Sequence, residues 1–232
     1  MSPRNPRKTR AEAGARVVQQ ELRDCLFLVA DKNMAAILKG FLGRERFFES
    51  LGTSRFMFEP IQDLLIASGD NDPGLFVRAH ELLAPYRLSH RHVVVIVDAS
   101  WDGSPGASAI KRTMTANLEQ QGWTKANSRV IVIDPELENW VWQKNIHVAH
   151  TLGCSTLEEM LDLVGPEAWP TGQPKPNTPK DLLERLLRHS DIPRSSSIYG
   201  AISEHVSISG CRDVAFLELR RALQTWFPAV PR

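Results

Sequence analysis

Acidic residues follow buried-looking apolar segments, and their types and spacing suggest metal chemistry. Asp98 comes directly after the run Val93–Val97, and Asp102 follows four residues later. Asp31 follows another apolar run, Cys25–Ala30. Carboxylates held close together repel each other unless a cation lies between them, and a hard divalent ion such as Mg²⁺ prefers oxygen ligands. Asp31, Asp98 and Asp102 are therefore candidate metal ligands and candidate catalytic residues.

A third acidic segment follows the β-branched run Arg129–Ile133, where three carboxylates occur within five residues. Among them, Glu138 is a candidate catalytic residue, as a further ligand or a general base. Lys32 and Lys111 are candidates to contact a phosphate group, although a single lysine is more often a solvated surface residue. The acidic segment after Ile133 would therefore contribute further carboxylates to the same candidate site.

The apolar runs before these acids predict the elements that would position them. Val93–Val97 is mostly β-branched and too short for a buried helix, so it indicates a strand covered on both faces. Helical patterns separate it from the runs Cys25–Ala30 and Arg129–Ile133, and such alternation predicts an α/β fold with a mostly parallel sheet. Open α/β sheets bind ligands at the carboxyl ends of their strands. Asp31 and Asp98 should therefore lie at one edge.

Further elements complete the expected organisation. Arg55–Phe58 and Leu64–Ala67 read as short strands, and a helix should run from Pro73 to Tyr86 with Asp72 as its N-cap. Beyond about residue 150 the patterns are helical only. We expect a disordered basic tail at residues 1–20, an α/β domain at residues 21–150, and a helical C-terminal region at residues 151–232 packed on it.

Composition excludes several classes of protein. The formal net charge is +1, so any contact with nucleic acid must come from a local basic patch. The three cysteines are far apart, which fits buried thiols in a reducing cytosol. No apolar run approaches the length of a membrane span and no signal peptide is visible. We expect a cytoplasmic protein with no membrane partner.

The acid-ended strands resemble the TOPRIM fold, which topoisomerases, primases and the old-family nucleases share. In that fold an acid after the first strand and an Asp pair after a later strand bind Mg²⁺ for phosphodiester chemistry. Asp31 matches the first acid, and Asp98 with Asp102 matches the pair. This chain has Asp31-Lys32 where the family usually has Glu-Gly, and three residues separate its Asp pair where the family has one.

A closer resemblance is to a small TOPRIM-like family of bacterial phage-defence loci, including methylation-associated defence systems. It implies a TOPRIM-like sheet with a helical C-terminal region, a Mg²⁺ or Mn²⁺ cofactor, and nucleic acid, above all DNA, as the substrate of nuclease-like chemistry. It also implies protein partners in a defence complex. The matching segments are Val29–Asn33, Asp72–Gly74, His80–Tyr86, Val97–Pro105, Pro135–Trp140 and Ser207–Phe216.

Three other interpretations remain open. Asp98 could cap the following helix while Asp102 is a solvated loop residue. Asp98-x-Ser100-x-Asp102 also resembles the metal-binding loop of integrin-type adhesion domains, which bind partners without catalysis. Finally, the chain could be a non-catalytic metal-binding or docking subunit of a larger defence complex, using exposed tryptophans. The six tryptophans can equally be core residues, and the candidates for such exposure are Trp140, Trp142, Trp169 and Trp226. The oligomeric state stays open.

Overall fold

The computed structural model describes residues 21–67 and 71–229, and the basic tail expected at residues 1–20 lies outside these ranges. Within them, four strands form one all-parallel sheet in the order β2-β1-β3-β4. The α/β class with a mostly parallel sheet is therefore confirmed. The strands are β1 (Arg23–Val29), β2 (Leu64–Ile66), β3 (His90–Asp98) and β4 (Ser128–Ile133).

Strand β3 lies in the interior of the sheet, with β1 on one side and β4 on the other. Its residues Val93–Val97 are fully buried, as expected for a strand with helices on both faces. The parallel register pairs Val29 with Ile96. Consequently Asp31, two residues after β1, lies at the same edge of the sheet as Asp98, as the sequence predicts.

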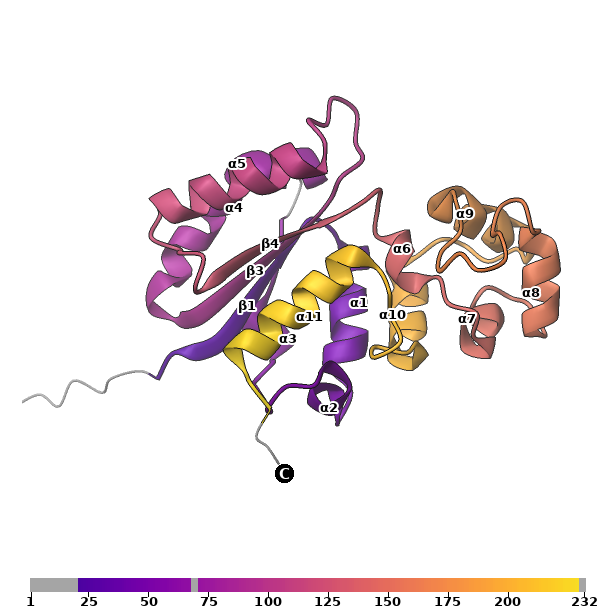
Figure 1. Ribbon diagram of the computed structural model, residues 1–232, viewed down its shortest axis with the longest axis horizontal. Helices are drawn as coiled ribbons and strands as arrows, with labels where there is room; N and C mark the ends of the chain where they lie inside the picture. Colours follow the sequence, from indigo (N-terminus) through magenta and orange to yellow (C-terminus); the bar gives the residue numbers. More distant parts are fainter. Residues whose placement is uncertain (1–20, 68–70, 230–232) are drawn as a thin grey trace, which may run out of the picture.

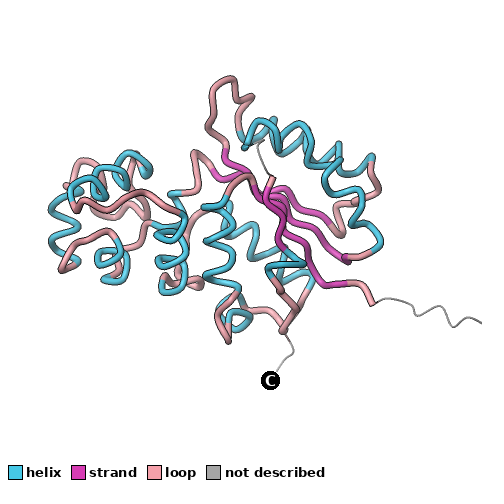
Figure 2. The backbone as a smooth tube through the Cα atoms, turned by 180° about the vertical axis from the view of Figure 1, so that it is seen from behind, coloured by secondary structure: helices cyan, strands magenta, loops and turns pink. Residues whose placement is uncertain are grey.

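Helices cover both faces of the sheet (Figures 1 and 2). Helices α4 and α5 lie on one face, and α1 and α11 lie on the other, with α10 packed against α1. Helices α7, α8 and α9 form a lobe beyond α6, away from the sheet (Figure 1). The helices before β4 are α1 (Lys32–Leu42), α2 (Phe47–Leu51), α3 (Pro60–Asp63), α4 (Asn71–Leu83), the 3-10 helix η1 (Ala84–Leu88) and α5 (Ala107–Gln120). Those after β4 are α6 (Glu138–Val141), α7 (Ile146–Thr151), α8 (Leu157–Val164), α9 (Pro179–His189), α10 (Ser196–His205) and α11 (Val214–Trp226).

The last helix returns to the first half of the chain. Phe216 of α11 makes edge-to-face contacts with Phe41 of α1, at 5.8 Å between ring centroids, and with Trp140 of α6, at 5.4 Å. Just beyond α11, Phe227 stacks on Phe56 with centroids 4.5 Å apart. Helix α11 thus joins the sheet, α1 and α6 in one core.

An ion-pair network joins three elements at the amino-terminal edge of the sheet. Asp63 accepts two hydrogen bonds from the guanidinium of Arg23, at 2.5 and 2.7 Å, one from His90 at 3.3 Å and one from the backbone N–H of Glu59 at 2.6 Å. Burial by itself would raise the pKa of Asp63, but these hydrogen bonds outweigh it and lower the pKa to about 2. The edge opposite Asp98 is therefore held by a carboxylate that is paired with a guanidinium and hydrogen-bonded through both oxygens.

One expected strand is absent. Residues 54–59 have no regular secondary structure, so the prediction of a strand at Arg55–Phe58 is wrong. Phe56 is buried because it packs between Phe47 and Phe227, and that burial produces a strand-like apolar pattern without a partner strand. A local sequence pattern cannot distinguish these two causes of burial.

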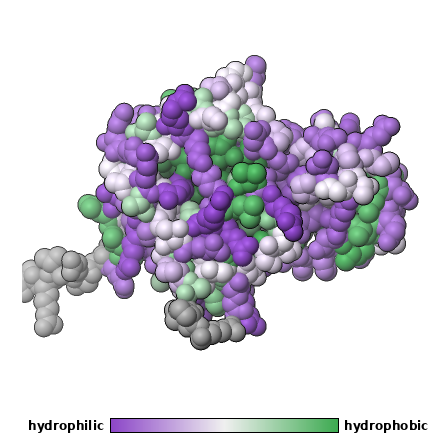
Figure 3. All heavy atoms as spheres, viewed as in Figure 1, coloured by the Kyte–Doolittle hydropathy of each residue, from purple (hydrophilic) through white to green (hydrophobic). Residues whose placement is uncertain are grey.

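Hydrophilic side chains cover most of the face seen in Figure 3, with an apolar area near its middle. The three cysteines are free and buried, as expected. Across residues 21–67 and 71–229, no helix combines the length and the apolar character that crossing a membrane requires.

Candidate functional site

Asp98 is the last residue of β3 and lies at the carboxyl-terminal edge of the sheet. The residue is partly buried, but its Oδ1 atom is enclosed and has no hydrogen-bond partner among the described residues. A buried polar atom without a partner is costly, so its persistence requires an explanation such as an ion that the atom would bind. Asp98 is thus the centre of the candidate site.

The surroundings of Asp98 oppose its ionisation. Burial raises its pKa well above the ordinary value, and the negative charges of neighbouring carboxylates raise it further. The largest contributions after burial come from Asp72, Glu138, Asp31 and Glu136. We call these four residues together with Asp98 the acidic edge.

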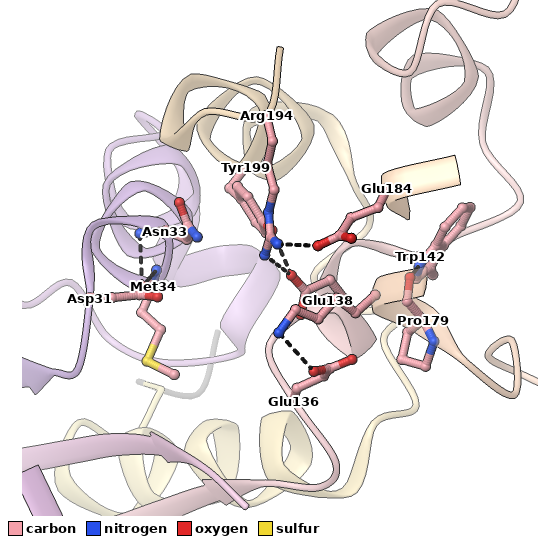
Figure 4. A network of polar contacts seen from close by, with 11 residues as sticks. Asp31, Asn33, Met34, Glu136, Glu138, Trp142, Pro179, Glu184, Arg194 and Tyr199 are labelled. Atoms are coloured by element: carbon pink, nitrogen blue, oxygen red, sulfur yellow. Dashed lines mark hydrogen bonds and ion pairs between the residues drawn. The ribbon is translucent and has the colours of Figure 1, made fainter. Parts of the chain in front are cut away.

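Asp31 caps helix α1. Its Oδ1 accepts hydrogen bonds from the backbone N–H groups of Asn33 and Met34, both at 2.8 Å (Figure 4). Within the described part of the chain, its second carboxylate oxygen has no hydrogen-bond donor. Because the cap requires only one oxygen, Asp31 can serve the helix and offer the other oxygen to a ligand.

Asp72 belongs to the acidic edge although the sequence assigned it another role. Helix α4 already begins at Asn71, so Asp72 lies in the first turn and is not the N-cap. Its Oδ1 accepts a hydrogen bond of 2.8 Å from the backbone N–H of Asp98. Burial raises the pKa of Asp72, and the charge of Asp31 raises it further. The turn-forming sequence before Pro73 concealed this contact, which joins residues 26 positions apart.

The loop after β4 brings two more carboxylates to the acidic edge. The carbonyl oxygen of Pro135 accepts hydrogen bonds from the N–H groups of Ala99 and Ser100, both at 3.1 Å, and so ties this loop to the end of β3. Glu136 forms an ion pair with Lys180 at 3.6 Å. Burial raises the pKa of Glu136, as does the neighbouring carboxylate of Glu138.

Glu138 is buried and already engaged by two donors. Its Oε1 accepts hydrogen bonds from Arg194 at 2.8 Å and from the hydroxyl of Tyr199 at 2.6 Å (Figure 4). Arg194 also pairs with Glu184 of α9. This network joins α6, α9 and α10, so Glu138 has a structural role in addition to its predicted chemical one.

The remaining predicted site residues lie in different surroundings. Asp102 is exposed in the turn before α5 and is not among the carboxylates that most raise the pKa of Asp98. Lys111 is held by Glu218 of α11, with Nζ 2.6 and 2.5 Å from the two carboxylate oxygens. Lys32 is exposed at the first position of α1 and lines an open pocket of about 490 Å³ together with Asp31. The structure therefore groups Asp31, Asp98 and Glu138, and leaves Asp102 and Lys111 outside the group.

The acidic edge offers oxygen donors, but they are not arranged as a complete ligand set. Within the described ranges, no three His, Cys, Asp or Glu side chains are placed so that they could hold a metal ion. The atoms that fit a cation with a preference for oxygen are Oδ1 of Asp98 and the second carboxylate oxygens of Asp31 and Asp72. An ion bound by all three carboxylates would require side-chain movements.

The sequence left open whether four tryptophans are exposed or belong to the core, and three of the four belong to the core. Trp140, Trp142 and Trp169 are buried, at 4%, 0% and 4% exposure. Trp142 and Trp169 contact each other edge to face, and the indole N–H of Trp142 donates to the carbonyl oxygen of Pro179 at 2.8 Å. Trp142 and Trp169 form the core of the helical lobe, and Trp140 packs on Phe216 of α11, so none of the three provides a docking surface.

Comparison with known proteins identifies no relative. No protein-family model, no curated protein and no solved structure matches the chain.

Proposed function

We propose that the acidic edge binds Mg²⁺ or Mn²⁺ and that the protein carries out metal-dependent phosphodiester chemistry on nucleic acid, DNA above all. The observation that carries this proposal is the enclosed Oδ1 atom of Asp98, which lacks a hydrogen-bond partner among the described residues and lies among four further carboxylates. A divalent cation would neutralise this cluster and give that atom a partner.

Three residues would hold the ion and two would assist. Asp98, Asp31 and Asp72 supply the oxygen atoms identified above. A bound Mg²⁺ would polarise a phosphoryl oxygen and lower the pKa of water. Lys32, exposed beside Asp31, is placed to contact a phosphate group of the substrate. Glu138, fixed by Arg194 and Tyr199, keeps negative charge beside Asp98 and so favours a cation there.

The biological setting of the proposal rests on the resemblance to TOPRIM-like proteins of phage-defence loci. On that basis we propose that the protein acts in the cytoplasm of a bacterium, on foreign DNA and with protein partners. The acidic edge at the carboxyl ends of parallel strands supports this assignment, because open α/β sheets use that edge for ligands. Asp72 would take the part that the sequence pattern gave to Asp102.

Thermal melting with and without metal tests the ion directly. Bound ion stabilises the folded state by RT ln(1 + [L]/Kd), about 2.7 kcal/mol at a hundredfold excess over Kd, so millimolar Mn²⁺ or Mg²⁺ should raise the melting temperature. Asp98→Asn should abolish that rise, and the matched variant Asp102→Asn should retain it because Asp102 is exposed. If neither Mn²⁺ nor Mg²⁺ changes the melting temperature of the wild-type protein, the metal site is refuted.

Cleavage of DNA by the purified protein tests the chemistry. We expect Mn²⁺-dependent cleavage that Asp98→Asn removes and Asp102→Asn preserves. One observation favours the alternative of a metal-binding subunit without catalysis: Lys111, a candidate phosphate contact, is neutralised by Glu218. A metal-induced rise in melting temperature without any cleavage, in the presence of DNA, would select that alternative.

A further inference from the structure

A second polar site lies on the helical lobe, at the far end of α6 from Glu138. It is an open pocket of about 460 Å³, a volume within the range of small-molecule sites. Its walls come from the segment after α6, the loop before α9 and the loop before α11. Its lining includes the cations Lys144, Lys175 and Arg212 and no carboxylate. We call it the cationic pocket.

Lys175 is the most enclosed of these three cations. Its Nζ donates one hydrogen bond, of 2.8 Å, to the carbonyl oxygen of Trp142. An ammonium group has three N–H donors, so two of them have no acceptor among the described residues. Burial lowers the pKa of Lys175, and the nearby Cys211 and Asp213 offset part of that effect. An anion in the pocket would accept hydrogen bonds from the two remaining N–H donors of Lys175 and would balance the positive charge of its ammonium group.

The other two cations are free to reach such an anion. Lys144 is exposed, with its Nζ 5.1 Å from the ring centroid of Trp169, and a cation over a ring keeps its N–H donors available. Arg212 is exposed, and within residues 21–67 and 71–229 neither cation has an ion-pair partner. The pocket therefore keeps a net positive charge.

The walls of the cationic pocket are fixed by hydrogen bonds. Gln143 and Ser207 exchange two, each of 2.9 Å, which join the segment after α6 to the loop before α11. The indole N–H of Trp169 donates to the carbonyl oxygen of Gln173 at 3.0 Å and so holds the loop that carries Lys175. A site of this kind exists before its ligand arrives, which lowers the cost of binding.

We propose that the cationic pocket binds the phosphate group of a nucleotide ligand through Lys144, Lys175 and Arg212. Phosphate carries the charge and the several acceptor oxygens that two ammonium groups and a guanidinium can satisfy together. The phosphate can belong to a free mononucleotide or to the backbone of single-stranded nucleic acid. The inference uses no metal and does not depend on the acidic edge.

Titration of the full-length protein in the presence of EDTA tests this site. The probes are AMP and a short oligothymidylate, with calorimetry as the primary measurement. The fluorescence of Trp142 and Trp169, which line the pocket, provides a second signal. We expect saturable binding of at least one probe. AMP binding as tightly as the oligonucleotide assigns a free nucleotide, and strong binding of the oligonucleotide alone assigns a nucleic-acid backbone.

Substitutions of the lining residues test whether the probes bind in the cationic pocket. Arg212→Ala and Lys144→Ala remove exposed side chains, so they should fold normally and each weaken binding about tenfold, as expected for loss of a charged hydrogen bond. Lys39→Ala, an exposed lysine on α1, is the matched control and should change nothing. Asp98→Asn should also bind normally, which separates this site from the acidic edge.

Two results would overturn the proposal. One is the absence of saturable binding of either probe by the wild-type protein. The other is binding that Arg212→Ala and Lys144→Ala leave unchanged. Lys175→Met adds a further comparison, since it keeps the length of the buried side chain and removes its charge; its binding should fall at least as far as that of Arg212→Ala.

Discussion

Asp63 and Asp98 are aspartates at opposite edges of the same sheet, and their surroundings shift their pKa values in opposite directions. Asp63 accepts hydrogen bonds from Arg23, His90 and a backbone N–H, and it is stable as an anion. Asp98 has one oxygen without a partner among the described residues and several anionic neighbours. The first environment stabilises the fold, and the second is suited to binding a cation.

Replacing Asp98 should stabilise the metal-free protein. Because its pKa is raised in the folded state, the folded protein binds more protons than the unfolded chain, so stability falls as pH rises above the ordinary value of 3.8. Asp98→Asn, which resembles the protonated form, should remove this loss and be the more stable protein at neutral pH. Urea unfolding of both proteins in EDTA across a pH series measures it. Equal free energies of unfolding of the wild type and Asp98→Asn at neutral pH would contradict the repulsion among the carboxylates of the acidic edge.

Replacing Asp63 should have the opposite effect. Asp63→Asn leaves Arg23 without its anion, which should cost about 3 kcal/mol of unfolding free energy at neutral pH. Its folded pKa of about 2 lies below the ordinary 3.8, so this stabilisation is present above pH 3.8 and is lost as pH falls toward 2.

The variant should therefore show a flatter acid dependence than the wild type. Glu21→Gln breaks an exposed pair with Arg91 and is the matched control, with an expected change below about 0.5 kcal/mol. If Asp63→Asn lowers the free energy of unfolding no more than Glu21→Gln does, Asp63 does not stabilise the amino-terminal edge of the sheet.

At the scale of elements, α1 and α10 approach closely because glycines lie between them. A Cβ atom at Gly40 would be 1.7 Å from Oγ of Ser203 and 2.8 Å from the carbonyl oxygen of Gly200. A Cβ atom at Gly200 would lie 3.9 Å from its nearest neighbour, which is ordinary contact. The two glycines therefore give a matched pair of substitutions in helices that share one interface.

Gly40→Ala should destabilise the protein by about 2 kcal/mol, because the helices must move apart despite the better helix propensity of alanine. Gly200→Ala should be neutral or stabilising by up to about 1 kcal/mol. Denaturant unfolding of the two variants measures the difference. Similar values for both would mean that α1 and α10 are not packed as closely as described.

How far the sequence predicts each element depends on how local its causes are. The strands Cys25–Ala30 and Val93–Val97 were predictable because each is a continuous apolar run, and the shared edge of Asp31 and Asp98 follows from parallel strands. The contact of Asp72 with Asp98 and the hydrogen bonds of Asp63 were not, since each joins residues far apart in the chain. Asp102 was included for its spacing from Asp98, although the turn-forming residues that follow it, Gly103 to Gly106, indicate an exposed turn.

At the scale of the whole molecule, the helices after residue 150 complete the core of the sheet. Helix α11 packs on β4, and Phe216 contacts Phe41 and Trp140. Helix α10 packs on α1, and Arg194, just before α10, holds Glu138. The acidic edge and the sheet therefore both depend on the C-terminal part of the chain.

A fragment of residues 21–150 should not fold by itself. It would expose the faces of α1 and β4 that α10 and α11 cover, and an apolar surface of that kind promotes aggregation. We expect the fragment to lack a cooperative thermal transition that the full chain shows under the same conditions. A cooperative melt of the soluble fragment would instead show that the α/β region is an independent domain.

The long interval between β4 and α11 has a consequence during synthesis. The last strand of the sheet ends at Ile133, and α11 ends at Trp226, about 90 residues later. At about 5–20 residues per second, the ribosome needs roughly 5–20 s to make that interval. Throughout this interval, the four strands of the described sheet have been made while one face still lacks α11. The nascent chain is therefore most prone to misassociation until α11 has been synthesised, and a chaperone would protect it most during that interval.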